Sequence, residues 1–131
     1  MSRKTGWQTR LVGVLSDEKY KTYQRGSTDC AMLVADCCLA VSGKDPAAEY
    51  RGKYGDLRGA LEALKEHGSI ADALDRHFER VDPAFAQRGD AVMMESEIAV
   101  GVLWAGRIWT SEESSGIVAV DREITAAWRV E

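Results

Sequence analysis

Cys30 is the strongest candidate for a reactive residue in this sequence, because it stands at the start of a predicted helix. Backbone N–H groups at a helix N-terminus favour the thiolate and lower the pKa of a cysteine there. Asp29 is a strong N-cap former, and its negative charge acts in the opposite direction by raising the thiol pKa. This opposition is smaller if the carboxylate binds backbone amides as a cap. The spacing alone favours a simpler interpretation, in which Cys30 is a small apolar residue of a core helix.

A cysteine nucleophile needs a general base within hydrogen-bond reach, and the chain has two histidines, His67 and His77. His67 falls at the end of a predicted helix, where its charge suits the helix C-terminus, and His77 falls in the next helix. We expect both to lie at the surface or at its boundary. Neither histidine has a Cys-x-x-Cys pair to join, so the sequence predicts no metal site and no cofactor.

The three cysteines, Cys30, Cys37 and Cys38, are crowded on one predicted helix. Cys30 and Cys37 are two helical turns apart, about 10 Å along the axis. A disulfide requires Cα atoms closer than about 7 Å. We therefore expect reduced thiols.

Asp36 lies on the same predicted helix, which is apolar on nearly every side. A buried carboxylate needs a partner, and either Arg51 or Arg58 could supply one. We interpret Asp36 as structural rather than catalytic.

The composition is that of an ordinary globular domain, with 131 residues, 45% hydrophobic and 29% charged. The net charge of −4 argues against non-specific nucleic-acid binding. No apolar run is long enough for a membrane span, and none follows the basic N-terminus as a signal peptide would require.

Helical signals dominate the first part of the chain. Helices are predicted over Gly6 to Leu15 with Thr5 as cap, from Asp29 to a stop at Ser42-Gly43, from Asp56 to Gly68, and from a capping box at Ser69 and Asp72 through Phe78. Asp82-Pro83 is predicted to end this helical part.

Short apolar or alternating runs follow the turn at Arg88-Gly89-Asp90. They predict strands at Ala91–Met94, Ile98–Trp104, Arg107–Trp109, Gly116–Val120 and Ala126–Val130, with a tight hairpin at Ala105-Gly106. The sequence thus predicts a single α+β domain over residues 1–131, mainly helical in 1–87 and mainly antiparallel strands in 88–131.

Several of these segments together resemble a known family. Tyr23-x-x-Gly26-x-x-Asp29-Cys30, followed by Leu33-Val34, resembles the nucleophile segment of NlpC-type cell-wall cysteine peptidases, which are papain-like. Arg88 to Val92 resembles the turn that opens their sheet, and Val100-Gly101-Val102 and Gly106-Arg107-Ile108 resemble their next two strands. The resemblance implies a papain-like fold, in which a central Cys-bearing helix packs on a C-terminal antiparallel sheet or small barrel.

Over most of its length the chain is more similar still to a small domain family encoded among the tail genes of tailed phages and gene-transfer agents. The shared features are the Gly6-Trp7 start, the Asp-Cys helix, the stretch from Ser42 to Ala48, Arg51-Gly52-x-Tyr54 and the terminal Ala127 to Val130.

One position departs from the peptidase pattern. In the peptidases a histidine directly precedes the Val-Gly pair and serves as the base for the cysteine, whereas this chain has Ala99 there. The polar partner on the following strand would fall between Ile108 and Thr110, where Thr110 is the one modest candidate. The resemblance therefore implies a retained nucleophile, Cys30, with its cap Asp29 and without its base.

These features favour a structural or adaptor component of a phage tail tip or baseplate, made in the bacterial host cytoplasm and carried in the virion. Its partners would be other tail tip or hub proteins, contacted through the Tyr-rich loop around Tyr50 and Tyr54; peptidoglycan is a further possible ligand, and nucleic acid is not expected. The alternative is an active cysteine amidase or endopeptidase that cleaves peptidoglycan peptides with Cys30 as nucleophile. A thiol-bearing binding module unrelated to phage is a third interpretation.

Overall fold

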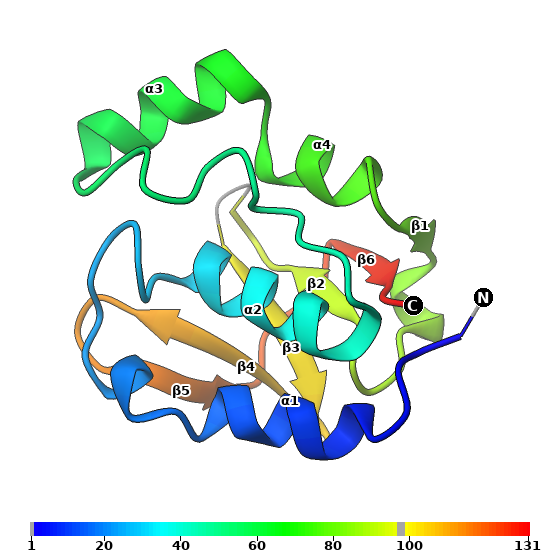
Figure 1. Ribbon diagram of the computed structural model, residues 1–131. Coiled ribbons are helices and arrows are strands. Elements are labelled where there is room, and N and C mark those ends of the chain that lie inside the picture. Colours follow the sequence, from blue (N-terminus) through cyan, green and yellow to red (C-terminus); the bar gives the residue numbers. More distant parts are fainter. Residues whose placement is uncertain (1, 97–98) are drawn as a thin grey trace.

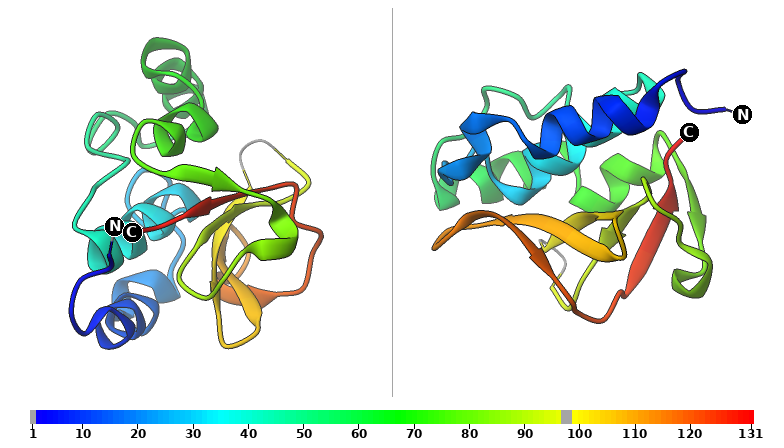
Figure 2. Two further views of the ribbon diagram at one scale, coloured as in Figure 1. Left: turned by 90° about the vertical axis from the view of Figure 1, so that its right-hand side faces the viewer. Right: turned by 90° about the horizontal axis from the view of Figure 1, so that it is seen from below.

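The computed structural model describes residues 2–96 and 99–131, and in this part of the chain helices cover one face of a six-stranded sheet (Figure 1, Figure 2). The helical elements are α1 (Trp7–Leu15), η1 (Glu18–Lys21), α2 (Cys30–Ser42), α3 (Leu57–His67), α4 (Ile70–Asp75) and η2 (Pro83–Phe85). The strands are β1 (Glu79–Val81), β2 (Ala91–Met93), β3 (Val100–Trp104), β4 (Arg107–Glu112), β5 (Gly116–Val120) and β6 (Ala126–Arg129). They follow the order β1-β6-β2-β3-β4-β5 with antiparallel pairing, which confirms the predicted α+β class.

Helix α2 lies at the centre of the molecule, between α1 and the sheet (Figure 1, Figure 2). Seven of its thirteen residues are buried, because apolar side chains leave it in every direction. The Asp29 side chain caps its start by accepting from the Met32 amide, and Gly43 ends it in the left-handed conformation. Both ends of α2 are where the sequence predicts them.

The sheet contributes to two apolar clusters because side chains alternate along its strands. Ala91 and Met93 of β2 join the helix-facing cluster with Trp128, whereas Val92 joins a second cluster with Ala127. The predicted β3–β4 hairpin is confirmed, since its strands pair up to the Trp104–Arg107 pair that flanks the two-residue turn.

Two predicted features of the helical part are wrong. Gly6, with φ of 73°, occupies the N-cap of α1, which has no side-chain cap, so Thr5 does not serve as the cap. Asp82-Pro83 does not end a run of helices, because α4 stops at Asp75 and β1 follows. The three residues of β1 are too few for a period-two signal, and their extended conformation depends on pairing with the distant β6.

The predicted strand from Ile98 starts later in the structure, where β3 begins at Val100. Ile98 itself lies outside the described residues. At the other end, β4 runs to Glu112 and is longer than the predicted Arg107–Trp109, because Thr110 to Glu112 continue its pairing with β5.

Asp90, predicted only as part of a turn, joins the two ends of the chain. Its fully buried carboxylate pairs with Arg3 at 2.8 Å and with Arg129 at 3.0 Å. It also accepts hydrogen bonds from the amides of Gln87 and Val130. The termini accordingly lie close together (Figure 2). A buried carboxylate is tolerated here because two cations and two amides surround it.

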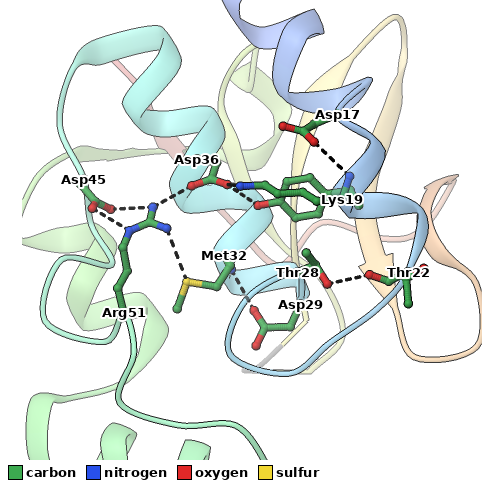
Figure 3. Close-up of polar contacts among 10 residues, drawn as sticks. Asp17, Lys19, Thr22, Thr28, Asp29, Met32, Asp36, Asp45 and Arg51 are labelled. Atoms are coloured by element: carbon green, nitrogen blue, oxygen red, sulfur yellow. Dashed lines mark hydrogen bonds and ion pairs between the residues drawn. The ribbon is translucent and has the colours of Figure 1, made fainter.

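The Asp36 carboxylate has an arginine partner, as predicted, and of the two candidates this partner is Arg51. Arg51 Nη2 lies 2.8 Å from Asp36 and also reaches Asp45, while Tyr20 donates its hydroxyl to Asp36 and Lys19 lies at 3.2 Å (Figure 3). Burial opposes ionisation of Asp36, but the hydrogen bonds from Tyr20 and Arg51 outweigh it and lower the pKa of the carboxyl group.

Arg58, the other candidate partner, points away from this network. Its guanidinium pairs with Glu62 at 3.4 Å on the exposed side of α3.

Candidate functional site

The Asp29 carboxylate is held by three donors at the start of α2. It accepts from the amides of Met32 and Gly26, each at 2.9 Å, and from the Tyr54 hydroxyl at 2.7 Å. Asp29 is 5% exposed, and Figure 3 shows its contact with Met32. The carboxylate thus performs the capping role predicted from the sequence, and the added bonds fix the loop that precedes Cys30.

Gly26 explains the first part of the motif that resembles the peptidase nucleophile segment. Its φ of 91° lies in the left-handed region, and a Cβ added there would sit 2.0 Å from the carbonyl oxygen of Tyr54. Only glycine therefore allows the loop to pack on Tyr54 while its own amide donates to Asp29.

Cys30 lines a cavity of about 400 Å³ that extends from α2 and the sheet to α3 and α4. Ala99, Val100 and Thr110 line the same cavity, and Thr110 donates its hydroxyl to the Val100 carbonyl at 2.8 Å. The structure thus brings together Cys30, Ala99 and Thr110, the three positions that the resemblance associates. The sequence predicted their association through a resemblance, and the folding of β3 and β4 against the start of α2 produces it.

The electrostatic environment of Cys30 favours the protonated thiol. Burial is the largest influence and raises the pKa of the thiol; the amide of Val100 opposes this by donating to the sulfur, and the charge of Asp29 raises the pKa again. The net effect is a pKa above the ordinary cysteine value. The helix N-terminus alone would act in the opposite direction.

Neither histidine is among the residues that line this cavity, as far as the described residues define its walls. His67 ends α3, where its ring packs against Tyr50 with 5.6 Å between centroids and its Nδ1 lies 4.0 Å from Glu49. His77 lies beside Phe78, with 6.1 Å between the ring centroids. His67 is thus half-buried and His77 exposed, in line with the predicted surface or boundary positions, and neither supplies an imidazole to Cys30.

The other two cysteines belong to the core. Cys37 and Cys38 are both buried, and burial raises the pKa of each thiol. Within residues 2–96 and 99–131, His, Cys, Asp and Glu side chains form no group of three that could hold a metal ion.

Helix α3 supplies a wall of the cavity that the sequence did not assign to any site. Leu57 and Leu61 on its apolar face are 51% and 54% exposed and line the cavity. Ala63 is the buried residue of this helix. Amphipathic spacing predicts that a helix has an apolar face, but it does not indicate what that face contacts.

The two tyrosines of the Tyr-rich loop, Tyr50 and Tyr54, are bound within the protein. Tyr50 is buried and donates its hydroxyl to the carbonyls of His67 and Gly68, at 3.0 and 2.8 Å. Tyr54 is half-buried and bound to Asp29. The side chain of Tyr50 is thus directed inward, and a partner contact through the rest of this loop stays a prediction.

Residues 2–130 match a protein family described as Domain of unknown function (DUF6950). The chain belongs to this family. The match spans the helices, the sheet and the cavity together, and no curated protein is similar enough to add a named relative. Among the described residues, no helix has the length and apolar character needed to cross a lipid bilayer.

Proposed function

We propose that this protein is a non-catalytic adaptor of a phage tail tip or baseplate, built on a papain-like, NlpC-type fold that has lost its general base. The observation that carries the proposal is the surroundings of Cys30. Ala99 shares the cavity with the cysteine at the position where the peptidases have histidine, and both histidines of the chain lie elsewhere.

A cysteine in this setting lacks two requirements of a nucleophile. Its pKa is raised by burial, so that little thiolate exists at neutral pH. Without a base to accept the thiol proton, the acid–base contribution of about 10² to 10⁴-fold is absent. The cavity itself is retained, which suits binding without cleavage. A place in the tail tip, with hub proteins as partners, rests on the family resemblance of the sequence.

Alkylation of Cys30 by iodoacetamide between pH 6 and 10 tests the loss of activation. We expect Cys30 to react more slowly than a cysteine in an unfolded peptide at pH 8, with a rate that keeps rising above pH 9. The Cys30→Ala variant shows how much of the labelling comes from Cys30. Cys37 and Cys38 are buried, so little labelling is expected to remain in this variant. Rapid labelling with a midpoint below pH 7 would instead support the active peptidase.

Two further measurements address activity and location directly. The protein is expected to release no peptides from purified peptidoglycan; release that is lost in Cys30→Ala would overturn the non-catalytic assignment. Mass spectrometry of purified virions is expected to find the chain in a fixed ratio to tail proteins, and its absence there would refute the adaptor role.

A further inference from the structure

The cavity beside Cys30 is bounded on its far side by an apolar stripe of α3. Leu57, Leu61 and Leu64 recur at i, i+4 and i+7, and all three line the cavity. Ile70 and Leu74 of α4 continue this wall. In Figure 1, α3 lies on the opposite side of α2 from α1, at the periphery of the molecule. We call this space, between α3 and the start of α2, the α3 groove.

The charged residues that line the α3 groove are compensated within the protein. Arg122 pairs with Glu112 at 2.7 Å, and Arg25 lies 3.9 Å from Glu113. Asp29 is held by its three hydrogen-bond donors. An occupant with a charged face would have to compete with these pairs or bury its charge against leucine, and both are unfavourable. An uncharged, apolar face is therefore the complementary one.

Three hydroxyl-bearing side chains that line the groove, Thr110, Ser111 and Tyr54, are also engaged internally. Thr110 donates to the Val100 carbonyl, Ser111 donates to the Thr28 carbonyl at 2.6 Å, and Tyr54 donates to Asp29. An extended peptide needs a series of main-chain hydrogen-bond partners along its path. An α-helix satisfies its own main chain and presents side chains alone. The lining therefore suits a helix better than a strand.

We propose that the α3 groove binds the apolar face of an amphipathic helix from a partner protein. This proposal deepens the adaptor function proposed above and rests on it for the kind of partner. A cavity of about 150 Å³ holds one benzene-sized group, so the groove volume of about 400 Å³ accommodates roughly two or three apolar side chains. Anchors at i, i+3 or i+4, and i+7 of the partner helix match that number.

Selection from a library of random 16-residue peptides tests this proposal. The wild-type protein is the bait, and the Leu61→Glu variant is the counter-selection; Leu61 is half-exposed, so the variant is expected to fold, which circular dichroism checks. Phe85→Glu is the matched control, because Phe85 is 70% exposed and lies outside the groove lining. Enriched peptides are then synthesised with a fluorescent label, and their affinities are measured by fluorescence anisotropy.

We expect enriched peptides to carry uncharged apolar residues at helical spacing. Leu61→Glu is expected to weaken their binding at least about tenfold, because it removes the burial of one leucine and introduces a charge, whereas Phe85→Glu leaves it unchanged. Three results would each overturn the helix as occupant. One is the selection of alternating, strand-like sequences, and another is the absence of enrichment over Leu61→Glu. The third is that palmitate displaces the labelled peptide more strongly than the unlabelled peptides do. Cys30-dependent release of peptide from peptidoglycan would refute the non-catalytic function and leave these affinities unaffected, so the two failures are distinguishable.

Discussion

Replacing Asp29 with alanine tests how much the start of α2 depends on this one carboxylate. The change removes an N-cap, which contributes about 1 kcal/mol. It also removes the acceptor for the Gly26 amide and the Tyr54 hydroxyl, at 2.9 and 2.7 Å, and each of these bonds contributes about 1 kcal/mol. The sum is a loss of about 3 kcal/mol in the free energy of unfolding.

Asp56→Ala provides a matched control in the same protein. Asp56 caps α3 through a single bond from the Gly59 amide at 2.7 Å, and it is exposed to solvent. Its removal is expected to cost about 1 kcal/mol or less. Because unfolding entropy scales with chain length, a loss of 1 kcal/mol lowers the melting temperature of a chain of 131 residues by about 4 °C.

Thermal unfolding followed by far-ultraviolet circular dichroism measures both variants. We expect Asp29→Ala to lower the melting temperature by about 12 °C and Asp56→Ala by about 4 °C or less. Tyr54→Phe isolates one bond of Asp29 and is expected to cost about 1 kcal/mol. Equal losses for the two aspartates would refute the reasoning, since the bonds from Gly26 and Tyr54 would then contribute nothing.

Three other predictions concern Cys30, Asp36 and Asp90. In Ala99→His an imidazolium beside the sulfur is expected to lower the pKa of Cys30, and the measurement is faster iodoacetamide labelling at pH 6 to 7. Ala99→Gln should leave the labelling profile unchanged, and no difference between the two variants would show that position 99 does not face the thiol. The pKa of Asp36 is lowered in the folded state, so its contribution to stability is present above the unfolded value of about 3.9 and is lost as the pH falls through the folded pKa. Asp36→Asn is therefore expected to destabilise the protein by about 2 kcal/mol at pH 7, and urea titrations are expected to show this difference shrinking as the pH falls below about 3.9. Asp90→Ala leaves Arg3 and Arg129 without their carboxylate partner and is expected to lower the free energy of unfolding by about 3 to 5 kcal/mol in the same assay. A loss below 1 kcal/mol would contradict this.

Features that depend on neighbouring residues were predictable from the sequence. The cap at Asp29, the end of α2 at Gly43 and the capping box at Ser69 are formed by side chains and amides within four residues of one another. The two-residue hairpin after Trp104 is equally local. Such signals do not depend on the rest of the fold, so the sequence expresses them directly.

Features that depend on distant partners were not predictable in the same way. Asp90 was expected only in a turn, yet it binds Arg3 and Arg129 from the two ends of the chain. Likewise, Tyr20 lies in a stretch for which no helix or strand was predicted, but its hydroxyl reaches Asp36 of α2. These residues are polar or single in the sequence, and no periodic pattern indicates which partner each will meet.

The chemistry of Cys30 shows the same division. The sequence by itself determined that Cys30 starts a helix capped by Asp29, and that the chain offers few histidines as a base. Local helix electrostatics would lower the pKa of the thiol. Only the tertiary structure decided that burial outweighs this effect, and that Ala99 rather than a histidine shares the cavity. The physical reason is that desolvation and proximity depend on which distant strands pack against the helix, and this packing is a property of the whole fold.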